Sequence, residues 1–193
     1  LMDRFPPHLK FTREEEARGE AGLQAMGLPV GAQFVCLIVR DSAYLDGHSA
    51  NDWSYHNYRD SDIKNYVLAA EALAKRGYFV IRMGAKVHSS INSTHPMVID
   101  YAANGMRNEF MDIYLGAKCA FCVSTGTGLD AVPEMLRRPM VYVNFVPLGN
   151  LPTFRTEFLS ITKRHVLKKS KKTLSLSEIF SQGVGYCVRS SGY

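Results

Sequence analysis

A short polar turn, Ser124-Thr125-Gly126-Thr127-Gly128, separates two apolar runs and carries groups that suit an anion. Its glycines would let a ligand approach the backbone closely, and its hydroxyls would add hydrogen bonds. If a helix begins here, its first N–H groups have no partner within the helix and favour a phosphate or a carboxylate. The turn matches neither the GxGxxG fingerprint nor the GxxxxGK(S/T) phosphate loop, and the same residue types make ordinary turns and caps. Ligand binding and structural capping are therefore both open interpretations.

Two arginines stand where apolar runs end, and each could bind a diphosphate. Arg40 and Arg82 each follow an uninterrupted apolar run, and Gly84 lies two positions beyond the second. A planar guanidinium forms paired hydrogen bonds with phosphate oxygens, so two of them at neighbouring strand ends indicate a basic rim. The alternative is that each arginine pairs with a nearby carboxylate, such as Asp41 or Asp100.

The segment from Ser42 to Asp60 carries side chains that could contact a sugar or a base. Loops of more than about 12 to 15 residues without secondary structure are more often functional or disordered than incidental. Aromatic rings would stack on a ligand, and the mixed donors would hydrogen-bond to it. The alternative is a surface flap whose rings cover the sheet. The side chains concerned are His48, Trp53, Tyr55, His56, Tyr58 and Arg59.

Alternating apolar and amphipathic segments supply the elements that would position these groups. Continuous apolar runs predict strands buried on both faces, and apolar residues at helical spacing predict helices between them. Repetition of strand, connection and helix is typical of a parallel sheet with right-handed crossovers. We therefore predict an α/β fold, a Rossmann-like parallel sheet flanked by helices, with the turn lying over a ligand-binding crevice. The predicted strands are 34–39, 78–81, 120–123 and 140–145, and the predicted helices are 12–26, 62–76, 108–118, 129–136 and 174–180.

Length and composition limit the class of protein. The chain has 193 residues, of which 46% are apolar, and this is enough for one globular domain with a buried core. We divide it into a helical lead-in at 1–33, a Rossmann-like domain at 34–150 and a basic extension at 151–193. No apolar run approaches the roughly 20 residues that span a bilayer, and the charged start does not resemble a signal peptide, so we expect a cytoplasmic protein. The chain begins at Leu1 and ends at Tyr193 without a closing helix, so we expect a fragment with a truncated extension.

The four cysteines are best explained as core residues. Two of them form a CxxC inside a predicted strand, and no second CxxC or matching histidine pair completes a zinc site. Free cysteine is among the most buried residue types. His88 and His95 are too loosely placed to indicate a metal, so we expect no metal ion. The cysteines are Cys36, Cys119, Cys122 and Cys187.

A basic run from Lys163 to Lys172 supplies much of the net charge of +5. Such a run is usually a solvated loop, but it could also make peripheral contact with an anionic membrane surface or an acidic glycan. It lacks interleaved aromatic residues that would stack on bases, so we do not expect it to bind nucleic acid.

Several tracts resemble a bacterial family of glycosyltransferases encoded in surface-polysaccharide loci. They are VCLIVRDSAYL, YRDSDIKNY, GYFVIRMG and FMDIYLGAKCAFCVSTGTGLDAVPEMLRRPMVYVNFVPL, and the similarity runs from about Phe11 to the end of the chain. The resemblance implies a GT-B arrangement in which residues 34–150 are similar to the carboxyl-terminal half that holds the nucleotide-sugar donor, without a metal. The family's strand-end arginine falls on Arg40, and its small-residue donor turn falls on Ser124 to Gly128. A more distant likeness to fucosyltransferases, which carry His-x-Arg at such a strand end, is broken because Ile38 occupies the histidine position.

The resemblance implies transfer of a sugar from a nucleoside diphosphate sugar to a surface glycan or a lipid-linked acceptor. Cationic side chains and helix N-termini can stabilise the departing diphosphate, and a base must accept the proton of the acceptor hydroxyl. The sequence offers Asp41 and His56 as candidates for that base, and the acceptor half of a complete enzyme could supply it instead. Two alternatives stay open, a non-catalytic module that binds nucleotide or sugar phosphate and a nucleotide-sugar epimerase. The candidate donor-binding residues, with no cofactor besides the donor, are Arg40, Tyr58, Arg59, Arg82, Gly84, Ser124, Thr125, Gly126, Thr127, Gly128 and Asp130.

Overall fold

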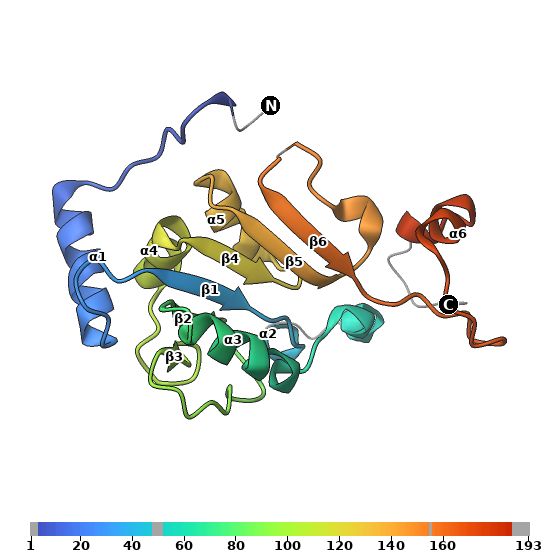
Figure 1. Cartoon of the computed structure of the whole chain (residues 1–193), viewed down its shortest axis with the longest axis horizontal. Helices are drawn as coiled ribbons and strands as arrows, with labels where there is room; N and C mark the ends of the chain where they lie inside the picture. Colours follow the sequence, from blue (N-terminus) through green and yellow to red (C-terminus); the bar gives the residue numbers. More distant parts are fainter. Residues whose placement is uncertain (1–3, 48–51, 155, 187–193) are drawn as a thin grey trace.

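Four strands form where the apolar runs predict them, and two further strands extend the sheet (Figure 1). The computed structural model describes residues 4–47, 52–154 and 156–186. The predicted strands are β1 (Phe34–Ile38), β2 (Phe79–Met83), β4 (Phe121–Ser124) and β5 (Met140–Phe145), and the further ones are β3 (Val98–Ile99) and β6 (Phe158–Thr162). Neighbouring strands pair in parallel in the order β3-β2-β1-β4-β5-β6. The predicted Rossmann-like α/β fold is confirmed.

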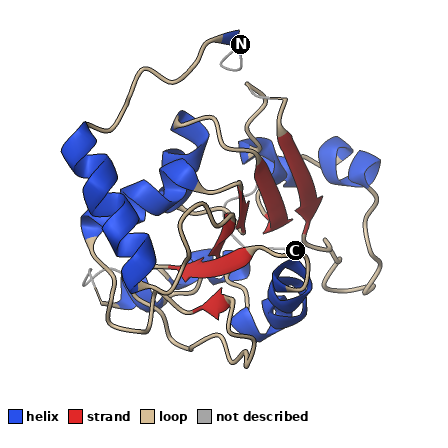
Figure 2. Cartoon of the chain, turned by 60° about the vertical axis from the view of Figure 1, so that its left-hand side comes forward, coloured by secondary structure: helices blue, strands red, loops and turns tan. Residues whose placement is uncertain are grey.

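Helices flank the sheet, and their starts follow from local side-chain caps (Figure 2). They are α1 (Arg13–Ala25), α2 (Ala43–Asp46), α3 (Val67–Ala74), α4 (Glu109–Lys118), α5 (Ala131–Met135) and α6 (Leu176–Ser181). The predicted capping box begins α1, because Thr12 and Glu15 each accept a hydrogen bond from the other's backbone N–H. Asn108 caps α4, and Asp62 caps a 3-10 turn that leads into α3.

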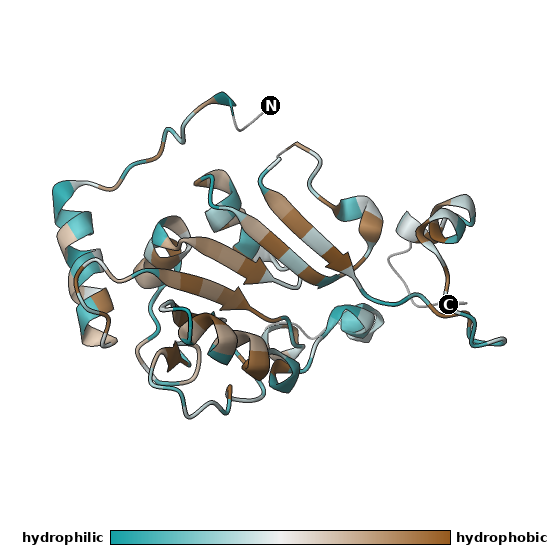
Figure 3. Ribbon diagram, viewed as in Figure 1, coloured by the Kyte–Doolittle hydropathy of each residue, from teal (hydrophilic) through white to brown (hydrophobic). Residues whose placement is uncertain are grey.

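Strand β1 lies at the centre of the sheet because both of its faces are apolar. All five of its residues are buried. Cys36 and Ile38 pack in the cluster that α1 and α4 cover, whereas Leu37 packs in the cluster that α3 covers. Figure 3 shows strongly hydrophobic residues along the central strands. An uninterrupted apolar run therefore identifies a strand that is covered on both sides.

The described cysteines pack in the core, as predicted. Cys36, Cys119 and Cys122 are free thiols with no exposed surface. The thiols of Cys36 and Cys119 donate hydrogen bonds to backbone carbonyls of α4. Burial raises the pKa of Cys36 and Cys122. Cys187 lies outside the described residues.

The sheet continues beyond residue 150, into the part of the chain expected to be an extension. β6 pairs with β5 from Phe158 to Thr162, although the sequence analysis predicted no strand there. The chain then leaves the sheet and reaches α6, which begins at a capping box between Ser175 and Glu178. No helix within the described ranges is long and apolar enough to cross a bilayer. Peripheral contact of the basic run with a membrane stays a prediction.

Candidate functional site

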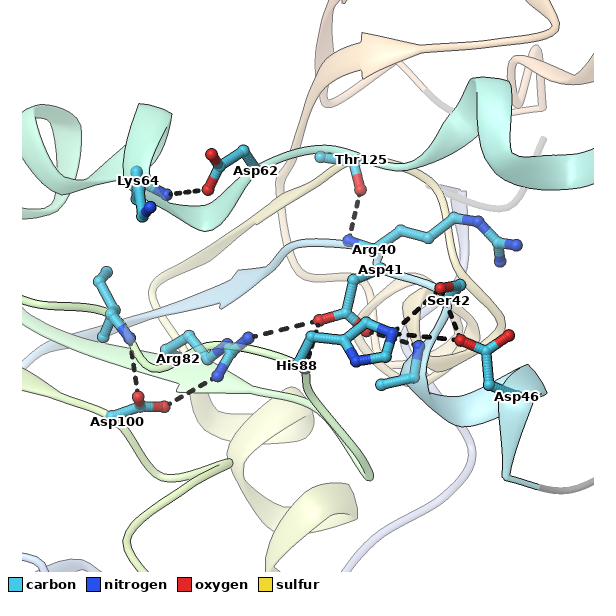
Figure 4. Close-up of polar contacts among 12 residues, drawn as sticks. Arg40, Asp41, Ser42, Asp46, Asp62, Lys64, Arg82, His88, Asp100 and Thr125 are labelled. Carbon is cyan, nitrogen blue, oxygen red and sulfur yellow. Dashed lines mark hydrogen bonds and ion pairs between the residues drawn. The ribbon is translucent and has the colours of Figure 1, made fainter. Parts of the chain in front are cut away.

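The carboxyl ends of β1 and β4 meet where the strand order reverses. β1 and β4 are neighbours at the middle of the sheet. After β1 the chain continues to β2 on one side, and after β4 it continues to β5 on the other side, so the two connections run in opposite directions. Two hydrogen bonds join the strand ends. The Thr125 N–H donates to the Ile38 carbonyl oxygen at 3.1 Å. The Arg40 N–H donates to Thr125 Oγ1 at 2.8 Å (Figure 4). In open α/β sheets, ligands bind in the crevice at this reversal.

The polar turn after β4 is held together by Asp130. Its carboxylate accepts hydrogen bonds from Ser124 Oγ at 2.6 Å and from the Thr127 N–H at 2.7 Å. Asp130 is only 5% exposed, and burial raises its pKa to about 6. The capping interpretation therefore describes Ser124, Thr127 and Asp130 well. A role of these residues in ligand binding stays a prediction.

The two glycines of the turn have different surroundings. Gly126 has a φ of 89°, and a Cβ there would lie 2.9 Å from the Phe145 ring. Gly128 has no atom within 4 Å of the position that a Cβ would take. Thr127 and Gly128 line two separate cavities, one on each side of the turn. We call this pair of residues the ridge.

The larger cavity, which we call the β1 cavity, has a volume of about 460 Å³. It lies at the carboxyl ends of β1 and β2, on one side of the ridge. Its wall combines apolar side chains with charged groups of both signs. The lining residues include Val39, Arg40, Asp41, Tyr44, Leu45, Met83, Gly84, Lys86, Val87, Arg107, Asp112 and Leu129.

The smaller cavity, which we call the β5 cavity, has a volume of about 380 Å³. It lies on the other side of the ridge, between α5, the end of β5 and the chain that follows β5. Its wall combines aromatic rings with carboxylates, a guanidinium and an amide. The lining residues include Arg59, Gly126, Asp130, Glu134, Tyr142, Phe145, Asn150, Leu151, Pro152, Thr153 and Phe154.

Arg82 lies in the interior and pairs with two carboxylates (Figure 4). Its side chain is 1% exposed, with Nη1 3.1 Å from Asp100 Oδ1 and Nη2 3.9 Å from Asp41 Oδ2. The other oxygen of Asp100 accepts the Ile91 N–H at 2.8 Å. The alternative in which the arginine pairs with carboxylates therefore describes Arg82. Arg82 is not among the residues that we propose to contact phosphate.

Asp41 is engaged in holding two loops. Its Oδ1 accepts the Ala43 N–H at 3.0 Å, and its Oδ2 accepts the His88 N–H at 3.0 Å. Both carboxylate oxygens therefore have fold-stabilising partners in addition to Arg82. Asp41, one of the two candidate bases, is therefore already engaged in hydrogen bonds that stabilise the fold.

Arg40 lies beyond the end of β1 and is joined to a lysine that the sequence analysis did not single out. Its Nε lies 3.1 Å from Asp60 Oδ1, and its side chain is 14% exposed. Lys163, which follows β6, donates from Nζ to the backbone oxygens of Tyr58, at 2.9 Å, and Asp60. Burial lowers the pKa of Lys163 and raises that of Asp60. The basic run therefore begins with a residue whose ammonium group holds the backbone of residues 58–60.

The segment from Trp53 to Arg59 reaches the turn through its last residue. Residues 54–59 form a 3-10 helix, and the ring of Trp53, which precedes it, stacks on that of His56 with centroids 5.8 Å apart. Arg59 Nη2 donates to the Gly126 carbonyl oxygen at 3.0 Å. The hydroxyl of Tyr58 is buried. Arg59 therefore lies at the turn, whereas Trp53, His56 and Tyr58 are not among the residues that line the two cavities, and His48 lies outside the described residues.

Cations and an imidazole lie near one another at this edge of the sheet. Burial, with the positive charges of Arg59 and Arg40, lowers the pKa of His56, which favours the neutral form of its ring. Arg40 and Arg59, which line the two cavities, supply positive charge suited to an anion. No group of three or more His, Cys, Asp and Glu side chains is arranged to hold a metal ion in the part of the chain described.

Comparison with known proteins gives a shared fold. No family model and no curated protein matches the chain. A solved structure of E. coli ADP-heptose LPS heptosyltransferase II matches with a TM-score of 0.55 and 18% identity, over 83% of this chain and 46% of that chain. E. coli heptosyltransferase WaaC with ADP-2-deoxy-2-fluoro heptose matches with a TM-score of 0.40 and 14% identity, over 92% of this chain and 50% of that one. The chain thus spans about half the length of either structure.

Proposed function

We propose that this chain binds the nucleoside diphosphate of a sugar donor and forms the donor-binding half of a GT-B glycosyltransferase. The observation that carries the proposal is the ridge, where two cavities meet at the reversal of strand order. The fold shared with half of a heptosyltransferase, and the resemblance of the sequence to polysaccharide glycosyltransferases, support the same function.

The diphosphate would lie on the ridge, because Gly128 leaves the backbone open to close approach. Arg40 lines the β1 cavity, and Arg59 lines the β5 cavity. The two guanidinium groups therefore flank the position proposed for the phosphates. Charge-assisted hydrogen bonds to phosphate are stronger in such a partly buried setting than on an open surface.

The nucleoside would occupy the β1 cavity, the larger of the two. Its wall includes Val39, Met83 and Leu129, which suit the flat apolar faces of a base. Gly84 and Asp41 lie at the same wall, where a ribose would meet them.

Transfer of the sugar needs a stabilised leaving group and a base. Arg40, Arg59 and the ridge would stabilise the departing diphosphate. We assign the base to His56 because its lowered pKa favours the neutral imidazole, whereas both oxygens of Asp41 hold the fold. The acceptor, a surface glycan or a lipid-linked sugar, would lie between this half and a second half of similar size.

A thermal-shift panel tests donor binding directly. UDP, ADP, GDP and their hexose conjugates are added without magnesium, with inorganic phosphate and free nucleosides as controls. We expect at least one diphosphate to raise the melting midpoint, since a ligand that binds only the native state stabilises it by mass action. A flat panel on folded protein would contradict the proposal. Binding without donor hydrolysis or transfer would favour the non-catalytic module.

A further inference from the structure

The β5 cavity has the composition of a site for a polyhydroxylated ring. Carboxylates accept hydrogen bonds from hydroxyl groups, guanidinium and amide groups donate to them, and aromatic rings pack against the C–H faces of a sugar. The cavity presents all of these: Glu134, Arg59 and Asn150 as polar groups, and Phe145 and Phe154 as rings. The β1 cavity also has carboxylates and guanidinium groups, but its wall includes one aromatic ring, Tyr44, and no side-chain amide.

We propose that the β5 cavity binds a pyranose sugar ring and that Glu134 selects it by accepting hydrogen bonds from its hydroxyl groups. The inference rests on the proposed function, because the ridge would place the sugar of a bound donor next to this cavity. The sugar could belong to the donor or to the acceptor, and both would present the same hydroxyl chemistry.

Glu134 is oriented by a buried partner. The hydroxyl of Tyr142 donates to Glu134 Oε1, and Tyr142 is only 1% exposed. An ionised carboxylate has about four lone-pair positions, so it can accept bonds from a ligand in addition to this one. Tyr142 thus fixes the direction of the carboxylate, and a fixed acceptor discriminates between hydroxyl configurations better than a mobile one.

Arg59 brings a guanidinium group to the wall of the same cavity. Its Nη2 donates to the Gly126 carbonyl oxygen, which holds the side chain beside the turn. A guanidinium donates charge-assisted hydrogen bonds to hydroxyl or phosphate oxygens. Phe154, which is 43% exposed, adds a ring at the opening. A volume of about 380 Å³ lies in the range of small-ligand sites.

Isothermal calorimetry on wild type and Glu134→Gln tests the donor form of the proposal. The probes are the diphosphate selected from UDP, ADP and GDP, and its conjugate among UDP-glucose, ADP-glucose and GDP-mannose. We expect the variant to bind the conjugate about tenfold more weakly or worse, and to bind the bare diphosphate within about twofold of wild type, because a charged acceptor is replaced by a neutral one. Tyr142→Phe leaves the charge but frees its direction, so its loss should be smaller.

Glu14→Gln is the matched control, since it makes the same change of charge on an exposed residue of α1 that lines neither cavity. Saturation-transfer NMR with methyl glycosides of glucose, galactose and mannose tests the acceptor form. If Glu134→Gln abolishes the glycoside contacts seen by NMR but leaves the affinities for the conjugate and the diphosphate unchanged, the cavity binds the acceptor sugar.

The outcomes separate this inference from the proposed function. Diphosphate binding that persists while neither conjugate nor glycoside responds to Glu134→Gln would overturn the sugar site and keep the donor site. Failure of every nucleotide to bind would end the donor proposal, and the glycoside measurement would then decide the cavity alone. Glycoside contacts that require Glu134 would sustain the sugar site, and their absence would overturn it.

Discussion

Arg82 and Arg40 look alike in the sequence, but the fold uses them differently. Each follows an apolar run on one of two neighbouring strands. Arg82 pairs in register with Leu37, whereas Arg40 lies two residues beyond the end of β1. Arg82 is therefore three residue levels deeper in the sheet, where its side chain is 1% exposed against 14% for Arg40. Depth along the strand decides whether a strand-end arginine is a structural cation or a candidate ligand contact.

The largest expected effect is on stability, and it comes from replacing the buried Arg82. Arg82→Met would leave the carboxylates of Asp100 and Asp41 without their cation. Removing one partner of a buried ion pair typically costs about 3 to 5 kcal/mol. We expect a loss of this size in the free energy of unfolding, measured by urea denaturation.

The double variant Arg82→Met/Asp100→Asn is the control. If the stranded charge is the cause, the second change should recover part of the loss, so the two effects will not add. An Arg82→Met protein that keeps its unfolding midpoint but no longer binds nucleotide would instead return Arg82 to the donor site.

Asp130 shows what happens to a buried carboxylate that is held by hydroxyl and N–H groups. Its pKa is raised from 3.8 to about 6 by burial, so the folded state binds its proton more tightly than the unfolded state does. Its contribution to stability is therefore full below about pH 4 and is lost as pH rises through about 6. We expect wild type to lose roughly 2 to 3 kcal/mol relative to Asp130→Asn between these pH values.

Urea denaturation of both proteins at pH 4, 5, 6 and 7 measures this difference. Asparagine keeps a carbonyl acceptor for the Thr127 N–H. A difference between wild type and variant that does not change with pH would show that Asp130 titrates as an ordinary carboxylate.

Much of the fold could be predicted because central parallel strands need apolar residues on both faces. The continuous apolar run from Phe34 to Val39 is typical of a strand that is buried on both faces. β6 escaped prediction because it is an edge strand: Leu159 and Ile161 are 70% and 66% exposed, and polar residues alternate with them. No continuous run marks such a strand. β3 has only two residues, too few for any pattern.

The site was harder to predict because its contacts join distant parts of the chain. Lys163 meets the backbone of Tyr58 across 105 positions. In the sequence Lys163 is only the start of a basic run, and its place directly after a strand could not be used because β6 itself was not predicted. Asp130 and Ser124 show the reverse case, since their hydrogen bond joins residues six apart and follows from the turn itself.

Arg40 supplies the exposed side of the comparison. If its guanidinium bonds to the donor diphosphate, Arg40→Ala should weaken diphosphate binding by roughly 1.5 to 3 kcal/mol, the range for hydrogen bonds to charged groups. Arg40→Lys should recover only part, because a point charge does not reproduce the planar fork. Calorimetry with the diphosphate measures both.

The melting midpoint of Arg40→Ala is the necessary control, because Asp60 pairs with Arg40. Asp60 has a 23% exposed side chain and burial raises its pKa, so the removal of the arginine should lower the midpoint somewhat. We expect a smaller fall than Arg82→Met gives, because Arg40 is more exposed than Arg82. A variant that melts as early as Arg82→Met, or that binds like wild type, would place Arg40 with Arg82 as a structural cation.

The smallest expected effects concern the two glycines of the turn, of which Gly126 has a structural role and Gly128 a proposed role in binding. Gly126→Ala places a Cβ at a φ of 89° and 2.9 Å from the Phe145 ring, so it should cost about 1 to 2 kcal/mol of stability. Gly128→Ala meets no atom within 4 Å and has no positive φ, so it should leave the urea midpoint nearly unchanged. Its methyl group would stand on the ridge, where the phosphates are proposed to approach the backbone, and we expect about tenfold weaker diphosphate binding. If Gly128→Ala binds the diphosphate as wild type does, the phosphates do not lie on the ridge, and the open space beside Gly128 is only a feature of the turn.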